Sequence, residues 1–338
     1  MAKTNLKALA SALGLSRTTV SRALNGYDDV SEATRQRVIE AARALGYQAD
    51  PTARRLATGR ADAIGIVYPF GAGDLGDPRF CEVVAGITEA LGERDMDLII
   101  ASARPNAELE TYRRLVEGRS VDGLIVARTL VNDRRIALLQ EWDFPFVAYG
   151  RTHSARPYWW FDFDNEAGAR AATQRLIEFG HRRIGLISAP LAMTFAAQRR
   201  AGFISALQSA GIDPSPKLMI ECSFDSAGGH DAATTLLNLA KPPSAVLVDN
   251  NLAGVGAFRA IVNSGRKPGG DVSLIVYDGV PAEVSHPYAV TAVTQPTGHA
   301  SGKAIAELVL DAIRDRDRCA HRLALPRIEP GNTDGPAD

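Results

Sequence analysis

Apolar residues in the segment 4–46 recur every three or four positions, which is the period of amphipathic helices on a shared core. A hydroxyl side chain that can cap a first turn precedes each apolar stretch, and a glycine follows it. Three short helices are predicted, capped by Thr4, Ser16 and Ser31 and ended by Gly14, Gly26 and Gly46. Their inward positions are Leu6, Leu9, Ala10 and Leu13, then Val20, Ala23 and Leu24, then Val38, Ala41, Ala42 and Leu45. Two helices joined by a short Gly-containing turn are typical of a helix-turn-helix.

A shorter helix is predicted from Asp50, which can cap it, to Gly59, which can end it. Isolated helices of about two turns are marginal in water, so this one is expected to be ordered only with a partner. Leu56 is apolar yet flanked by arginines, as in a wedge that enters the minor groove of DNA between base steps. A linker in which Leu56 packs against the body of the protein is the alternative.

From residue 61 onward, apolar runs of strand length alternate with helical segments. The predicted strands are Ala63–Tyr68, Leu98–Ala101, Gly123–Ala127, Phe146–Tyr149, Arg183–Ile187, Ala245–Val248 and Ser273–Val276. Predicted helices between them include Arg79–Glu93, Glu166–Phe179, Gln198–Ala210 and Ala253–Asn263. This alternation indicates the α/β class, with parallel sheets and ligands at the carboxyl ends of the strands. The series is too long for one sheet, and the polar, proline-containing segment Arg151–Tyr158 interrupts it, so two lobes with a cleft between them are predicted.

These patterns divide the chain into four parts. They are a three-helix headpiece over 1–48, a hinge helix over 49–60, a two-lobed core over 61–330 and a flexible tail over 331–338. The segment from Pro326 to Asp338 contains no leucine heptad. A C-terminal coiled-coil bundle is therefore not expected there.

Charge separates the first part from the rest. Residues 1–60 hold ten Lys or Arg against five Asp or Glu, whereas the remainder holds 28 against 34. A basic segment attached to an acidic body indicates that the first segment binds a polyanion. A solvated basic helix face is the alternative explanation.

No apolar run approaches the ~18 residues that a membrane span needs, and the apolar block near the N-terminus is shorter than the core of a secretion signal. A cytoplasmic protein is expected. Cys81, Cys222 and Cys319 are odd in number and widely spaced, which fits neither a disulfide framework nor a metal site. Buried thiols are predicted.

The second helix is expected to expose Arg17, Thr18, Thr19, Ser21 and Arg22. In the major groove, Arg can donate to O6 and N7 of guanine together, and Thr or Ser can reach phosphates or the thymine methyl group. An ordinary surface helix is the alternative, but the three-helix frame and the capped short helix favour DNA binding.

In the core, polar and aromatic side chains that follow strands are the candidate ligand contacts. Carboxylates, amides and guanidinium groups together suit a polyhydroxylated ligand, and an aromatic face suits a sugar ring. The candidates are Arg79, Phe80, Ser102, Arg128, Arg151, Trp160, Phe161, Arg199, Asn251 and Asp278. A surface salt bridge is the alternative role for any one arginine, and a place in the core is the alternative for the aromatic cluster at 159–161.

Nothing in the sequence indicates catalysis. The six histidines are scattered, without the spacing of a metal or nucleophile site, and no cofactor or metal is expected. The segment Gly71–Gly76 matches the Gly-x-Gly-x-x-Gly fingerprint, yet Asp74 would place a carboxylate near the pyrophosphate and Pro78 delays the following helix. A nucleotide-cofactor enzyme remains one alternative. A sugar receptor without DNA function is the other, and it leaves residues 1–60 unexplained.

The segment 15–26 reads Leu-Ser-Arg-Thr-Thr-Val-Ser-Arg-Ala-Leu-Asn-Gly, and the segment 53–60 reads Ala-Arg-Arg-Leu-Ala-Thr-Gly-Arg. These two segments resemble the recognition helix and the hinge of the LacI/GalR family of bacterial transcriptional repressors. Similarity continues at 180–184, at Arg199 before Gly202, and from Thr291 to Pro296. The resemblance implies a headpiece, a hinge and a periplasmic-binding-protein-like core in a homodimer. It implies the DNA contacts Thr4, Ser16, Arg17, Thr18, Thr19, Ser21, Arg22, Asn25, Ala53, Arg54 and Leu56.

Three positions depart from the family pattern. Ala49-Asp50-Pro51 stands where the hinge usually begins with Pro-Asn, Asn251 stands where an aspartate is common, and Gly279 follows Asp278 where a second acid is usual. The stretch 161–166 resembles the sugar-responsive members more than the purine-responsive ones. The expected protein is thus a repressor that binds a pseudo-palindromic operator as a dimer, under control of a sugar such as an α-glucoside.

Overall fold

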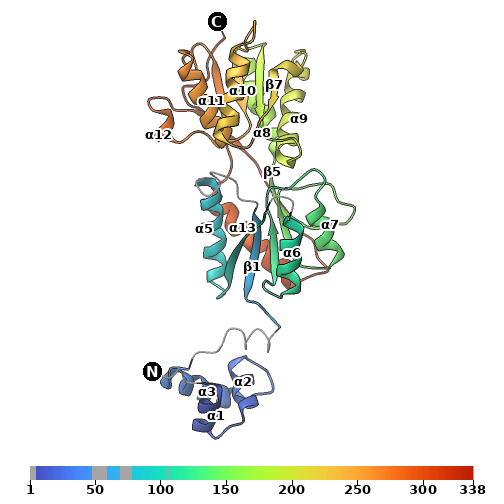
Figure 1. Ribbon diagram of the computed structural model, residues 1–338, viewed down its shortest axis with the longest axis vertical. Helices are drawn as coiled ribbons and strands as arrows, with labels where there is room; N and C mark the ends of the chain where they lie inside the picture. The colour runs from blue at the N-terminus through green and yellow to red at the C-terminus, as the bar shows by residue number, and fades with distance from the viewer. Residues whose placement is uncertain (1–4, 48–58, 69–77, 105–106, 338) are drawn as a thin grey trace.

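The computed structural model describes residues 5–47, 59–68, 78–104 and 107–337. The N-terminal part consists of α1 (Leu6–Leu13), α2 (Arg17–Leu24) and α3 (Glu32–Ala44), as Figure 1 shows. Leu9, Val20 and Val38 are fully buried in their shared core. The predicted helix-turn-helix is confirmed, including the cap Ser16, whose hydroxyl accepts a hydrogen bond from the Thr19 amide.

Two details of this unit differ from the prediction. Asn5, not Thr4, caps α1, because its Oδ1 atom accepts from the Ala8 amide at 3.0 Å; Thr4 lies outside the described residues. Leu45 was predicted to face inward and is 43% exposed. The reason is that α3 ends at Ala44 and the chain turns at Gly46 with φ +62°, so Tyr47 packs against the core instead.

The first lobe contains one parallel sheet in the order β11-β5-β4-β3-β1-β2. Its strands are β1 (Ala63–Tyr68), β2 (Asp97–Ser102), β3 (Gly123–Val126), β4 (Phe146–Tyr149), β5 (Trp159–Phe163) and β11 (His321–Ala324). Helices α5 (Pro78–Gly92) and α13 (Gly298–Arg314) cover one face, and α6 (Glu108–Glu117) and α7 (Arg134–Glu141) cover the other (Figure 1).

The second lobe has the sheet order β12-β10-β9-β8-β6-β7, with only β12 antiparallel. Its strands are β6 (Ile184–Ser188), β7 (Met219–Glu221), β8 (Ala245–Val248), β9 (Ser273–Tyr277), β10 (Thr291–Thr294) and β12 (Arg327–Glu329). One face packs on α8 (Asn165–Glu178) and α9 (Thr194–Ser209), and the other on α10 (Ser226–Leu237) and α11 (Asn251–Asn263). A short helix, α12 (Ala282–Ser285), follows β9.

The chain passes between the lobes three times, after β5, after β10 and after β11. Arg151–Tyr158 therefore does not separate the lobes, contrary to the prediction. It leads from β4 into β5, and β5 pairs with β4 inside the first sheet. The aromatic cluster at 159–161 belongs to this strand and packs in the core of the first lobe.

The C-terminal residues 331–337 are packed on the second lobe, so the prediction of a flexible tail over 331–338 is wrong for them. Thr333 is fully buried and donates its hydroxyl to the Leu274 carbonyl. The Asp334 carboxylate accepts from Arg175 and from the Thr291 hydroxyl, both at 2.5 Å. The partners of these polar groups lie on the second lobe, and these hydrogen bonds hold the segment in place although it contains few apolar residues.

We expect His181 to make the stability of the second lobe depend on pH. His181 is 2% exposed, and its ring nitrogens lie 2.8 Å from the Ser244 hydroxyl and 3.0 Å from the Gly335 carbonyl. Burial lowers the pKa of His181 below its usual 6.5. On acidification His181 is protonated in the unfolded chain at a higher pH than in the folded chain. The free energy of unfolding therefore falls as the pH drops below 6.5.

Urea unfolding on both sides of that pH measures the effect. His181→Gln, which can still donate and accept hydrogen bonds, should show a smaller loss of stability on acidification than the wild-type protein. Equal losses in the two proteins would contradict the assignment.

The cysteines correct another expectation. Cys81 and Cys319 are exposed and Cys222 is half-buried, because Cys81 lies on an outer turn of α5 and Cys319 on the loop between α13 and β11. Separately, the helices within the described ranges are all too short or too polar to cross a membrane.

Candidate functional site

Helix α2 presents a polar surface beside a hollow of the headpiece. Val20 and Ala23 point into the core, which leaves Arg17, Thr18 and Arg22 exposed. Thr19 and Ser21, also predicted to be exposed, are partly buried. The hollow is lined by Leu6, Arg17, Thr18, Ser21, Arg22 and Tyr27. Sequence reasoning did not identify Leu6 and Tyr27 as part of this surface.

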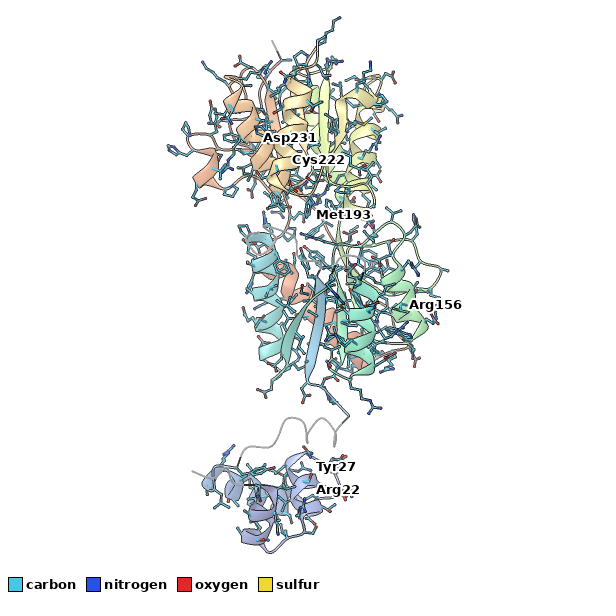
Figure 2. All side chains as sticks on the ribbon, in the orientation of Figure 1. Arg22, Tyr27, Arg156, Met193, Cys222 and Asp231 are labelled. Atoms are coloured by element: carbon cyan, nitrogen blue, oxygen red, sulfur yellow. The ribbon has the colours of Figure 1, made fainter. Side chains whose placement is uncertain are left out.

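Arg22 is held at the edge of this hollow. Its guanidinium lies 2.8 Å from the Asp29 carboxylate and 5.1 Å from the centre of the Tyr27 ring, and Figure 2 shows Arg22 and Tyr27 next to each other. The Asn25-Gly26 turn that ends α2 brings these later residues back beside the helix. An exposed ion pair contributes little stability, so Arg22 can exchange Asp29 for another acceptor at low cost.

Two other predicted DNA contacts have local structural roles. Ser16 caps α2, and Asn25 ends it while donating to the Ser21 hydroxyl at 3.4 Å. The predicted contacts Ala53, Arg54 and Leu56 lie outside the described residues, as does the Gly71–Gly76 fingerprint.

A cavity lies between the two lobes and contains six of the ten predicted ligand contacts. Arg79 and Phe80 come from α5 and Arg128 from the end of β3 in the first lobe. Arg199, Asn251 and Asp278 come from the second lobe, on α9, on α11 and after β9. All six line this one cavity. The cavity thus lies at the carboxyl ends of the parallel strands of both sheets, which is where that rule places ligands.

The other four predicted contacts lie outside the cavity. Ser102 is exposed at the end of the edge strand β2, and Phe161 is 5% exposed within the core. Trp160 stacks on His321 with ring centres 4.5 Å apart, and the Arg151 guanidinium lies 5.7 Å from the Trp160 ring centre. Trp160 and Phe161 lie before the carboxyl end of β5, whereas its last two residues, Asp162 and Phe163, reach the cavity, one from each face of the sheet.

Several lining residues were not identified from the sequence. Tyr149, Asp162 and Gln295 stand at or just after strand ends, so the same rule could have found them. Phe195 and Phe224 come from the start of α9 and the loop before α10, where the strand pattern gives no signal. The cavity residues outside the predicted set are Ile66, Tyr68, Val83, Ala127, Thr129, Tyr149, Gly150, Asp162, Phe163, Asn165, Phe195, Phe224, Asn250 and Gln295.

Arg199 is a buried cation fixed at the base of the cavity. Its Nε atom donates to Asn165 Oδ1 at 2.9 Å and its Nη1 atom donates to the Asp249 carbonyl. The guanidinium lies 3.7 Å from the centre of the Tyr277 ring and 4.9 Å from that of Phe195. A planar donor held in this way keeps a defined orientation toward a ligand.

Two carboxyl groups near Arg199 are affected by burial. Burial raises the pKa of Asp249 to about 6, against the charge of Arg199. Burial likewise raises the pKa of Asp162, against the hydrogen bonds it accepts from the backbone amides of Phe163 and Arg151. Asn165 donates to Asp162 at 3.3 Å, so amide, carboxyl and guanidinium groups form one connected set of acceptors and donors.

Charged groups from the two lobes meet across the cavity. Arg79 lies 3.5 Å from Asp278, and the Arg128 guanidinium lies 4.5 Å from the Tyr68 ring centre and 4.8 Å from that of Phe224. The lining thus combines three arginines and two aspartates, Asp162 and Asp278, with aromatic rings. A ligand with many hydroxyl groups and an apolar ring face suits such a lining.

Comparisons with known proteins match two parts of this chain to two family models. Residues 5–50 match the family model for bacterial regulatory proteins of the lacI family, and residues 61–328 match the model for periplasmic binding proteins and the sugar binding domain of the LacI family. The HTH-type transcriptional regulator RafR of Escherichia coli is 40% identical over 97% of this chain and 98% of its own length. The regulator AglR of Rhizobium meliloti is 39% identical over 91% of this chain and 88% of its own.

Solved structures show the same architecture. The complex of the transcriptional regulator CelR with cellobiose superposes with a TM-score of 0.74 at 30% identity, covering 98% of this chain and 100% of that one. The Lac repressor dimer bound to operator has a TM-score of 0.83 at 24% identity, covering 98% and 99%, and shows that the fold is shared.

Proposed function

Because this chain belongs to the LacI family of bacterial regulatory proteins, we propose that it represses transcription from an operator and that a neutral sugar controls its affinity for that operator. Its relatives RafR, AglR and CelR carry the name HTH-type transcriptional regulator, which is not the name of an enzyme. The headpiece of 1–48 binds DNA, the hinge of 49–60 connects it, and the core of 61–330 binds the effector.

The exposed face of α2 supports the DNA half of this proposal. Arg17, Thr18 and Arg22 project beside one another from a helix that is capped and packed on its opposite side. A helix-turn-helix places such a face in the major groove, and two copies contact two half-sites. A homodimer is therefore part of the proposal.

The first lobe offers one surface that supports dimerisation. Strand β2 forms the edge of its sheet, and Ile100 on that strand is 40% exposed. An apolar edge strand invites pairing unless another surface covers it, and a second copy of this chain would cover it.

The observation that carries the sugar half is the cavity lining. Arg199, Asn165 and Asp162 form a fixed set of planar polar groups, and the aromatic rings of Phe80 from the first lobe and Phe195 from the second line the same cavity. The CelR structure holds cellobiose, and we expect an effector of the same neutral oligosaccharide class here, such as an α-glucoside.

A thermal-shift panel tests this directly. Maltose, trehalose, cellobiose, glucose, hypoxanthine and NAD⁺ are added to the full-length protein, and compounds that raise the melting temperature are then titrated against the protein bound to operator DNA. We expect an α-linked disaccharide to stabilise the protein and to change operator affinity by about 5–150-fold, the usual range of allosteric coupling. Stabilisation by hypoxanthine or NAD⁺ with no response to any sugar would overturn the proposal.

A further inference from the structure

The loop from Arg128 to Asp133 connects the lobes at a point separate from the three chain crossings. The Thr194 amide and hydroxyl donate to the Thr129 carbonyl at 2.9 and 3.1 Å, and the Val131 amide donates to the Ala192 carbonyl at 2.9 Å. Leu130 and Met193 form an isolated antiparallel bridge between these hydrogen bonds. We call this short pairing of 129–131 with 192–194 the interlobe seam.

The same loop begins inside the effector cavity. The Arg128 guanidinium lies between Tyr68 of the first lobe and Phe224 of the second. Its backbone has φ +50°, in the left-handed region that a residue with a side chain adopts at a cost. The left-handed backbone conformation at Arg128 therefore requires stabilising contacts from neighbouring residues.

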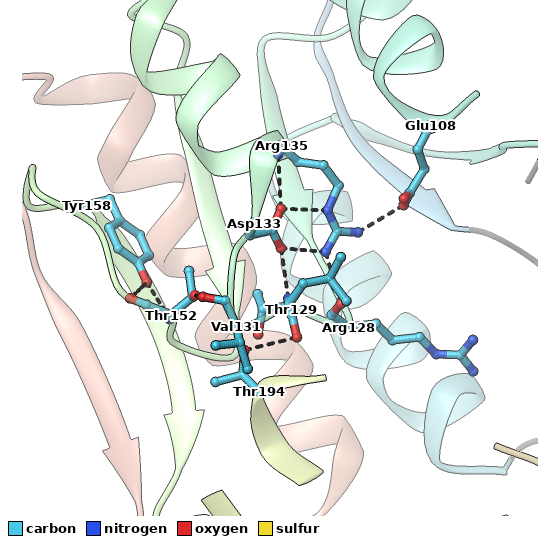
Figure 3. A network of polar contacts seen from close by, with 10 residues as sticks. Glu108, Arg128, Thr129, Val131, Asp133, Arg135, Thr152, Tyr158 and Thr194 are labelled. Carbon is cyan, nitrogen blue, oxygen red and sulfur yellow. Dashed lines mark hydrogen bonds and ion pairs between the residues drawn. The ribbon is translucent and has the colours of Figure 1, made fainter. Parts of the chain in front are cut away.

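Arg135 supplies that hold from the first turn of α7, as Figure 3 shows. Its Nη2 atom donates to the Arg128 carbonyl at 2.9 Å and to Asp133 at 2.7 Å, and its Nη1 atom donates to Glu108 at 2.9 Å. The second oxygen of Asp133 accepts from the Nε atom of Arg135 at 2.9 Å. Both side chains are buried, with 5% and 0% exposed.

Asp133 holds the other end of the loop. Its carboxylate accepts hydrogen bonds from the backbone amides of Leu130 and Arg135, each at 3.0 Å. Asp133 thereby caps α7 and at the same time fixes Leu130, a residue of the interlobe seam. The Thr152 hydroxyl donates to the Val131 carbonyl at 2.7 Å. The backbone of the loop is thus tied to the first lobe at both ends while its middle pairs with the second lobe.

A buried ion pair is a poor choice for stability alone, because desolvation offsets most of the Coulombic gain. Its planar donors do fix geometry, since the guanidinium reaches three acceptors at once in one orientation. A loop held in this way is stiff, so a displacement of its first residue moves the seam rather than being absorbed within the loop.

We propose that Arg135 is a positioning residue. Together with Asp133 and Glu108, it makes the loop 128–133 a rigid connector between the effector contact at Arg128 and the interlobe seam. The proposal rests on the proposed function for its effector, but the hold of Arg135 on the seam is a property of the sugar-free protein. Two measurements separate these points.

The first measurement uses no ligand. Amide hydrogen exchange is followed in the full-length protein for Arg135→Lys, which keeps the charge but cannot reach Asp133, Glu108 and the Arg128 carbonyl together. We expect exchange at Val131 and Thr194 to rise about tenfold while strand β8 keeps its protection, as for a local opening. Arg134→Lys, the exposed neighbour on the same helix, is the matched control and should match the wild type. Exchange raised equally throughout the core, or unchanged at the seam, would overturn the proposal.

The second measurement is the coupling factor, the ratio of maltose dissociation constants with and without operator. We expect Arg135→Lys to bring this factor close to one while maltose affinity in the operator-free protein changes less than about threefold, because lost coupling needs no lost binding. A lowered melting temperature with unchanged coupling would show a merely structural role and contradict the proposal.

If Arg135→Lys fails to fold, Glu108→Gln tests the hold of Arg135 on the loop, and Thr194→Val tests whether the seam itself carries the coupling. Glu108 is 24% exposed, and Thr194→Val removes one donor of the seam at constant shape. Both should raise seam exchange and lower coupling. A wild-type protein that does not respond to maltose or to the rest of the panel would contradict the sugar effector. A seam insensitive to Arg135→Lys, or to Glu108→Gln where Arg135→Lys does not fold, would contradict the role of Arg135.

Discussion

Arg199→Met is expected to reduce the affinity of this protein for its sugar effector by about a hundredfold. The substitution removes the hydrogen bonds that the charged guanidinium would donate to the sugar in a buried cavity. Their loss costs about 3 kcal/mol of binding free energy, and each 1.4 kcal/mol corresponds to a factor of about ten in affinity. The same change leaves Asn165 Oδ1 and the Asp249 carbonyl without the donor they share. Isothermal titration with the sugar identified by the panel measures the effect.

A matched control separates this effect from a general loss of stability. Arg200 is the next residue on α9 and does not line the cavity, so Arg200→Met should keep the wild-type affinity. Arg199→Lys retains a cation and serves if Arg199→Met unfolds. Sugar affinity within about twofold of wild type in a folded Arg199 variant would remove this residue from the binding site.

Arg22→Ala is expected to cost about 1–3 kcal/mol in discrimination between operator and unrelated DNA, the scale of one bidentate base contact. Its stability should hardly change, because the ion pair of Arg22 with Asp29 is exposed, with side chains 45% and 52% accessible. Fluorescence anisotropy with operator and scrambled duplexes measures both affinities at one salt concentration.

Lys7 provides the comparison for that result. It is exposed on α1, and if it contacts phosphate, Lys7→Ala should weaken binding to operator and to scrambled DNA alike. An Arg22→Ala protein with the same ratio of the two affinities as wild type would mean that Arg22 reads no base.

Buried strands were among the elements that the sequence predicted with the correct bounds. Ala63–Tyr68, Phe146–Tyr149 and Ala245–Val248 have the predicted bounds, because a strand covered on both faces is a continuous apolar run. Strand β5 was not recognised, since the buried Asp162 interrupts its apolar run and the sheet to which it adds is set by pairing with β4. The third crossing of the chain, after β11, depends in the same way on distant pairing.

The C-terminal segment shows a second limit. Composition indicated a tail because 331–337 contains glycine, proline and acids rather than apolar residues. Its order comes from specific partners such as Arg175 and Thr291, which lie far away in the sequence. Local pattern carries no information about such contacts.

The cavity residues likewise divide into those that local sequence patterns identify and those that only the tertiary fold brings together. Strand-end reasoning found Arg128 and Asp278, since parallel strands bring their carboxyl ends to one edge. It assigned Trp160 and Phe161 to the site because it did not recognise β5 and so could not tell that the strand ends at Phe163, where Asp162 and Phe163 line the cavity instead. Phe195 and Phe224 reach the cavity from a helix and a loop, and only the tertiary fold brings their ring centres to 5.8 Å.

The central claim is that DNA binding and sugar binding are carried by separate parts of the chain and communicate through the core. The most direct test measures operator affinity without sugar and sugar affinity without DNA for both Arg22→Ala and Arg199→Met in the full-length protein. We predict that Arg22→Ala loses operator affinity and keeps sugar affinity, and that Arg199→Met does the reverse. Loss of sugar binding in folded Arg22→Ala, or of sugar-free operator binding in folded, dimeric Arg199→Met, would contradict the claim.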